Sequence, residues 1–118
     1  MAGTVLVVDD DIAIAGMIRE VLEMEGHRVL HAVDGESLRI ALIEQPHLIL
    51  LDINMPGMDG PEVSRRLRAE PATTHIPIVV MSSHVARGTI PPEMPHDDRL
   101  SKPFALDVLV ATVARWVR

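Results

Sequence analysis

The sequence predicts an α/β fold in which helices cover both faces of a five-stranded parallel sheet. Three observations support this fold class. Short aliphatic runs typical of buried strands alternate along the chain with segments whose apolar residues recur at helical spacing. Glycine or proline separates most of these segments. The chain has 118 residues, enough to bury one hydrophobic core, so we expect a single domain over residues 1–118.

Five segments are predicted to be strands. Residues 4–8 are an aliphatic run, and residues 27–33 form a shorter strand that ends at an Asp-Gly pair. Residues 47–51 contain four consecutive aliphatic side chains, which predict a strand buried on both faces. Residues 78–81 are a fourth strand, and Leu100 and its neighbours form a weak fifth strand.

Four helices are predicted between and after these strands. Residues 11–25 carry apolar side chains at helical spacing until Gly26 ends the helix. A second helix, centred on 38–42, ends near Pro46, and proline opens a third helix over 61–68. The last helix has an apolar stripe made of Leu106, Leu109, Val110, Val113 and Val117.

The alternation of strands and helices favours right-handed crossovers and therefore a doubly wound, flavodoxin-like sheet with strand order 2-1-3-4-5. In that order, the ends of four strands bring together Asp9, Asp10, Asp52, Ser82 and Lys102. Crowded carboxylates resist joint ionisation unless a cation lies among them. A cluster with oxygen ligands alone suits a hard ion, so we expect Mg²⁺.

Each of these residues also has a purely structural interpretation. Acids at 9–11 favour the positive end of a helix dipole, and we expect Asp11 to serve only as a helix cap. A serine that ends a strand, as Ser82 does, commonly just starts a loop. Asp52 has no such explanation, because a carboxylate directly after four aliphatic side chains is costly to bury without a partner.

Composition excludes several classes of function. The formal charge of -6, from 17 acidic and 11 basic residues, argues against direct contact with nucleic acid. Lys102 is the only lysine among those basic residues, and a lysine suits a single phosphate or carboxylate oxygen. The chain has no cysteine and therefore gives no information on its redox compartment. It shows no cationic leader followed by an apolar stretch and no apolar run long enough to cross a membrane, so we expect a cytoplasmic protein without a membrane partner.

Four motifs, in this order, resemble the receiver domain of response regulators in bacterial two-component signalling systems. They are Val7-Val8-Asp9-Asp10, the block from Leu51-Asp52 to Met58-Asp59-Gly60, Ile76-Pro77 with the hydroxyl of Ser82, and Lys102-Pro103-Phe104. The resemblance covers the whole chain except the segment between the fourth and fifth strands.

The resemblance implies that Asp52 accepts a phosphoryl group from a phosphohistidine on a sensor histidine kinase or a histidine phosphotransfer protein. It implies Mg²⁺ bound by Asp10, Asp52 and the backbone carbonyl of Asn54, with Asp9 acting through water. Lys102 and Ser82 would contact the phosphoryl oxygens. Ser83 and His84 would modulate the reaction, while we expect the other five histidines to be structural or solvent-facing.

By the same resemblance the chain is a signalling switch that catalyses only its own phosphorylation and dephosphorylation, and it passes the signal to a downstream protein or output domain. Two other classes of function stay open. One is a degenerate receiver that acts as an unphosphorylated interaction module. The other is a magnesium-dependent phosphohydrolase, against which stands Asn54 where an acid would be needed two residues after Asp52.

The chain departs from the family pattern between the fourth and fifth strands. Three prolines and a glycine within 83–98 exclude a regular helix, so we expect the family's fourth helix to be reduced or missing. Arg99 also stands where the family usually has an aromatic residue, so we expect the 83–98 loop to carry the output instead. A missing helix would expose the sheet around Val79 and Met81, which predicts docking of a partner or formation of a homodimer.

Overall fold

The computed structural model describes residues 2–33, 36–53, 60–83 and 94–117. Within these ranges the chain alternates strands and helices in the order β1-α1-β2-α2-β3-α3-β4-β5-α4. The five strands form one parallel sheet with the order β2-β1-β3-β4-β5, as predicted. The strands are β1 (Thr4–Val8), β2 (Arg28–Ala32), β3 (Leu48–Asp52), β4 (Ile78–Ser83) and β5 (Asp98–Lys102).

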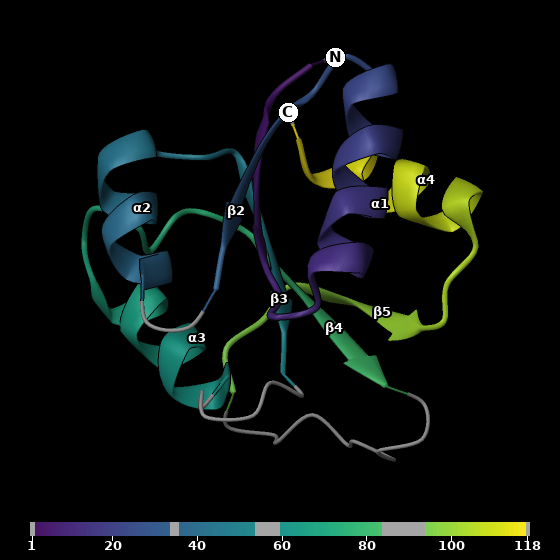
Figure 1. The fold of residues 1–118 in the computed structure, drawn as a ribbon. Coiled ribbons are helices and arrows are strands. Elements are labelled where there is room, and N and C mark those ends of the chain that lie inside the picture. The colour runs from purple at the N-terminus through teal and green to yellow at the C-terminus, as the bar shows by residue number, and fades with distance from the viewer. Residues whose placement is uncertain (1, 34–35, 54–59, 84–93, 118) are drawn as a thin grey trace.

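Two helices cover each face of the sheet. The helices are α1 (Ile12–Met24), α2 (Ser37–Glu44), α3 (Gly60–Ala69) and α4 (Leu106–Trp116). Helices α1 and α4 lie on one face, and α2 and α3 lie on the other (Figure 1). No helix among the described residues is both long and apolar enough to cross a membrane.

Helix α1 begins and ends where the sequence predicts. The side chain of Asp11 accepts a hydrogen bond from the Ile14 N–H at 3.1 Å, so the cap expected from Asp11 is confirmed. The chain then leaves the helix through Gly26, whose φ of 91° is a conformation that glycine adopts without strain. This start matters for function because Asp9 and Asp10 lie in the short connection between β1 and α1.

Successive side chains along each strand point to opposite faces of the sheet, and on each face they form a hydrophobic core. The first core lies under α1 and α4, where Ile18 and Leu109 pack on Val7 and other strand residues. The second core lies under α2 and α3, where Ala41 and Leu67 pack on the opposite face of the sheet. Because β1 and β3 are covered on both faces, the polar residues at their carboxyl ends lie next to buried apolar side chains.

The residues at the start of β5 are anchored by hydrogen bonds from three other elements. Asp97 accepts hydrogen bonds from the Ile78 N–H at 2.8 Å and from Arg68 at 2.6 Å. Asp98 accepts one from the indole N–H of Trp116 at 2.9 Å, and this bond helps to hold the pKa of Asp98 below its ordinary value. These contacts fix the strand that carries Lys102 at its end.

The expected loss of the helix between β4 and β5 falls largely on residues 84–93, which lie outside the described residues. The described residues 94–97 form no helix. The expected exposure of Val79 and Met81 is wrong, because both side chains are fully buried in the first core. The pleat directs them toward α4, away from the face on which Met94 is buried in the second core. The homodimer expectation therefore loses its structural argument.

Candidate functional site

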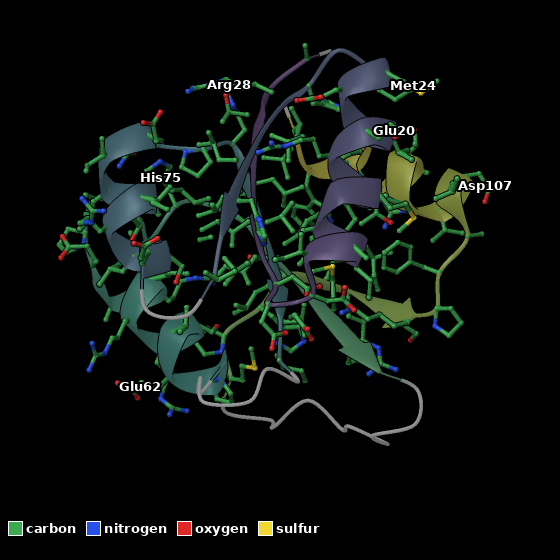
Figure 2. The ribbon with its side chains drawn as sticks, viewed as in Figure 1. Glu20, Met24, Arg28, Glu62, His75 and Asp107 are labelled. Atoms are coloured by element: carbon green, nitrogen blue, oxygen red, sulfur yellow. The ribbon has the colours of Figure 1, made fainter. Side chains whose placement is uncertain are left out.

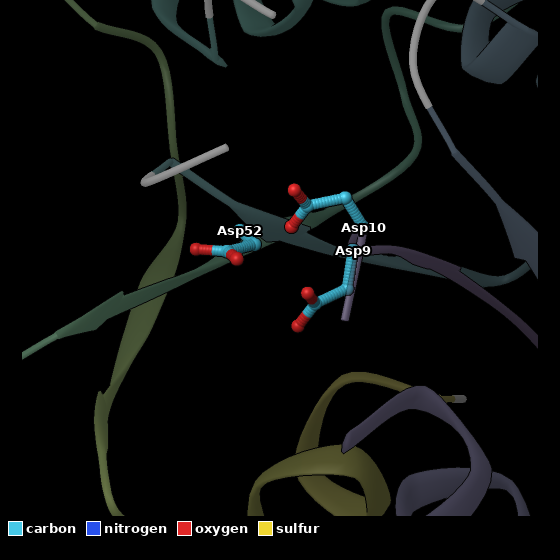
Figure 3. A group of neighbouring side chains, drawn as sticks. All are labelled: Asp9, Asp10 and Asp52. Atoms are coloured by element: carbon cyan, nitrogen blue, oxygen red, sulfur yellow. The ribbon is translucent and has the colours of Figure 1, made fainter. Parts of the chain in front are cut away.

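Acidic residues from two neighbouring strands meet at the carboxyl end of the sheet. Asp9 and Asp10 follow β1, and Asp52 is the last residue of β3, which pairs with β1 in parallel. One carboxylate oxygen from each of the three residues lies within 4.8 Å of the others. Figure 3 shows these side chains side by side. We call Asp9, Asp10 and Asp52 the acid cluster.

Two members of the acid cluster are buried, and burial of an ionised carboxylate costs free energy. Asp9 is 0% exposed and Asp52 is 3% exposed, whereas Asp10 is open to solvent. A buried carboxylate needs a charged partner or strong hydrogen bonds to stay ionised. The structure supplies such a partner from the end of β5.

The partner is Lys102, which bridges the two buried carboxylates. Its Nζ donates hydrogen bonds to Asp9 Oδ2 at 2.9 Å and to Asp52 Oδ2 at 3.1 Å. Burial alone would lower the pKa of Lys102, but the hydrogen bonds and charges of Asp9 and Asp52 outweigh it and hold that pKa above its ordinary value. The lysine is therefore fully charged at neutral pH and neutralises one of three negative charges.

The acid cluster is suited to bind a hard divalent cation. Its ligand atoms are carboxylate oxygens, which Mg²⁺ prefers, and two negative charges remain after pairing with one lysine. A site with one exposed and two buried carboxylates also leaves one side open for the water ligands that Mg²⁺ keeps. The residues present therefore fit the metal that the sequence predicts.

Of the remaining predicted site residues, some lie among the described residues and some do not. Ser82 is 6% exposed and lies in β4 next to Met81, the residue that pairs with Asp52. Ser83 ends β4 and pairs through its main chain with Lys102. Asn54 and His84 lie outside the described residues, so their predicted roles are not tested.

One contact of the site was not predicted from the sequence. His31 Nε2 lies 2.7 Å from the backbone oxygen of Asp9, although the sequence indicated only a structural or exposed histidine. The sequence places His31 on the strand beside β1, which could have indicated a position near Asp9. It does not give the register between the two strands, on which the contact depends. His27, in contrast, is buried and accepts a hydrogen bond from the Gly3 N–H, which agrees with a structural role.

Comparisons with known proteins agree with the geometry. The family model of the response regulator receiver domain matches residues 5–114. The transcriptional regulatory protein PrrA of Mycobacterium tuberculosis is 43% identical over 117 residues, which cover 97% of this chain and 49% of that protein. The DNA-binding dual master transcriptional regulator RpaA of Synechocystis is 37% identical over 97% of this chain and 48% of its own length. The chain thus spans about half the length of these curated relatives.

Solved structures show the same fold over almost the whole chain. A putative response regulator from Chloroflexus aurantiacus has a TM-score of 0.88 and 32% identity, covering 99% of this chain and 98% of that one. The receiver domain of the sensor histidine kinase PA1611 from Pseudomonas aeruginosa has a TM-score of 0.89 and 27% identity, with the same coverage of 99% and 98%. That structure contains a magnesium ion coordinated in its active site cleft.

Proposed function

Because this chain belongs to the response regulator receiver domain family, we propose that it is a phospho-accepting switch in which Asp52 is the phosphoacceptor. The observation that carries this proposal is the bridge from Lys102 to Asp9 and Asp52 at the carboxyl end of the sheet. A vestigial pocket has no need to keep two buried carboxylates and their lysine. The degenerate receiver is therefore not favoured.

In the proposed reaction, an oxygen of Asp52 attacks the phosphorus of a phosphohistidine. A P–O bond forms, the P–N bond breaks, and its electron pair returns to the imidazole of the donor. Asp10, Asp52 and the backbone carbonyl of Asn54 would hold Mg²⁺, with Asp9 acting through water, and the ion would supply positive charge to the phosphoryl oxygens. Lys102 stabilises the same oxygens with its ammonium, and Ser82 donates its hydroxyl to one of them. Hydrolysis of the acyl phosphate resets the switch.

The partners follow from this chemistry. The donor is a sensor histidine kinase or a histidine phosphotransfer protein, and the receiver of the signal is a downstream protein or an output domain. RpaA is described as DNA-binding, but the net charge of -6 in this chain does not suit direct contact with DNA. We place these events in the cytoplasm, within a single domain formed by residues 1–118.

Intact mass spectrometry after incubation with Mg²⁺ and acetyl phosphate tests the proposal. We expect the parent to gain one phosphoryl group and Asp52→Asn to gain none. Asp107→Asn is a matched control, because Asp107 is an exposed aspartate on α4, away from the acid cluster (Figure 2), and this variant should be modified like the parent. A parent that binds Mg²⁺ yet gains no mass contradicts the proposal and favours the interaction module.

A further inference from the structure

The backbone carbonyl of Asp9 has an unusual partner. His31, on β2, places its Nε2 2.7 Å from this oxygen, and the ring is partly buried. A carbonyl oxygen only accepts, so the imidazole Nε2 carries the hydrogen and donates it. A short bond from a ring with few rotatable bonds restrains the atom it contacts.

The bond lies where the ladder between β1 and β2 ends. Among the described residues, the main-chain bond between these strands nearest the site runs from the Asp9 N–H to the Ala32 oxygen at 3.2 Å, and β2 ends at Ala32. The side chain of His31 thus supplies a hydrogen bond to the carbonyl of Asp9, the first residue after β1.

This carbonyl belongs to the peptide group that joins Asp9 to Asp10. Because a peptide group is planar, holding its oxygen fixes the orientation of the whole unit. The side chain of Asp9 is held as well, since Oδ1 accepts from the Asp11 N–H at 2.9 Å and Oδ2 accepts from Lys102. His31 therefore restrains the peptide group from which both carboxylate side chains extend.

We propose that His31 is a positioning residue for the cation site: its Nε2–H holds the Asp9 carbonyl so that the Asp9 and Asp10 carboxylates face Asp52. This inference rests on the proposed function, because it concerns the cation that the acid cluster binds. His31 does not touch the cation. It lowers the cost of cation binding, because the carboxylates are oriented before the cation arrives.

The surroundings of His31 allow the residue to be replaced. Its ring lines a pocket of about 400 Å³ between α1 and α2, together with Leu30 and Ile40, so a side chain of similar size has room. His31→Leu removes the donor and keeps the bulk. His31→Gln keeps an N–H donor at similar reach. His75→Leu is the control, because exposed His75 precedes β4 at the opposite end of the strands (Figure 2).

The test is calorimetric titration of the four proteins with MgCl₂, with no phosphoryl donor present. We expect the dissociation constant of H31L to rise about tenfold, as for groups that orient metal ligands. We expect H31Q to recover most of the affinity and H75L to bind like the parent. Circular dichroism verifies folding, and H31M replaces H31L if H31L does not fold.

Two results overturn the inference alone. They are an H31L protein that binds Mg²⁺ as tightly as the parent, and an H31Q protein that binds as weakly as H31L, because the hydrogen bond is then not the cause. A parent that binds no Mg²⁺ at all overturns the proposed cation site and this inference together. The parent titration therefore separates the two failures.

Discussion

At the scale of single residues, charge balance in the acid cluster sets function against stability. One carboxylate oxygen from each of the three residues lies within 4.8 Å of the others, and the ammonium of Lys102 contacts the carboxylates of Asp9 and Asp52. Without a divalent cation, the excess negative charge destabilises the folded state, because unfolding separates the carboxylates. Under the proposed function, the cluster serves cation binding at a cost in stability.

Asp10→Asn tests this balance, because Asp10 is the exposed member of the cluster. In magnesium-free buffer we expect the free energy of unfolding to rise by about 1 kcal/mol, the size of one repulsion at such a distance in water. The same variant should bind Mg²⁺ more weakly. Urea unfolding and calorimetry measure the two effects.

Asp107→Asn serves as the control for this prediction. It removes an exposed aspartate from the first turn of α4, where a negative charge is favourable, so its unfolding free energy should not rise. An Asp10→Asn protein that is no more stable than the parent would show that the cluster carries no excess repulsion.

His27 makes stability depend on pH near neutrality. Burial holds the pKa of His27 below its ordinary value of 6.5, and Nδ1 accepts the Gly3 N–H at 3.1 Å. The unfolded chain therefore binds a proton more readily than the folded one. Stability from neutral His27 is present above pH 6.5 and is lost as the pH falls through 6.5 toward the lower pKa of the folded state.

We expect His27→Asn, whose side-chain oxygen can accept the Gly3 N–H, to lose less stability than the parent on acidification through this range. Urea midpoints measured well above and well below pH 6.5 give the comparison. An equal loss of stability on acidification in both proteins would show that His27 is not the cause of the pH dependence.

At the scale of elements, the start of α3 is packed tightly against the exit of β3. A Cβ added at Gly60 would lie 2.9 Å from the Ile53 Cα, which directly follows Asp52. That distance is too short for two carbon atoms, and the obstacle is backbone rather than a flexible side chain. The absence of a side chain at Gly60 therefore lets α3 begin beside the proposed phosphoacceptor.

Gly60→Ala should lower the free energy of unfolding by about 1–3 kcal/mol, as overpacking commonly does. The matched control is Gly16→Ala, because a Cβ at Gly16 meets nothing within 4 Å in the exposed side of α1. That variant should gain about 1 kcal/mol from helix propensity. Thermal or urea unfolding followed by circular dichroism measures the expected loss of stability in Gly60→Ala and the expected gain in Gly16→Ala. A Gly60→Ala protein as stable as the parent contradicts the steric argument.

The elements themselves were largely predictable from the sequence. The aliphatic runs at the centre of the sheet and the apolar stripe of α4 are repeated patterns, and the structure places them within a residue or two of the expected bounds. The error concerned orientation. Burial of Val79 and Met81 against α4 depends on the pleat of β4, which a run of four apolar residues does not reveal.

At the scale of the whole molecule, the strand order determines which residues meet. Alternating strands and helices predict the order β2-β1-β3-β4-β5, and that order alone brings Asp9, Asp52 and Lys102 to one end of the sheet. The acid cluster and its lysine were therefore predictable. The contact of His31 with Asp9 was not, because it depends on the exact register of β1 and β2 and on a side-chain direction.

Chemical trapping identifies the residue that carries the phosphoryl group, which we propose is Asp52. Borohydride reduces an aspartyl phosphate to homoserine, and peptide mass spectrometry then identifies the position that changed. After reaction of the parent with Mg²⁺ and acetyl phosphate, we expect homoserine at position 52 and unmodified aspartate at 9 and 10. Homoserine at another position, with residue 52 unchanged, would contradict this proposal.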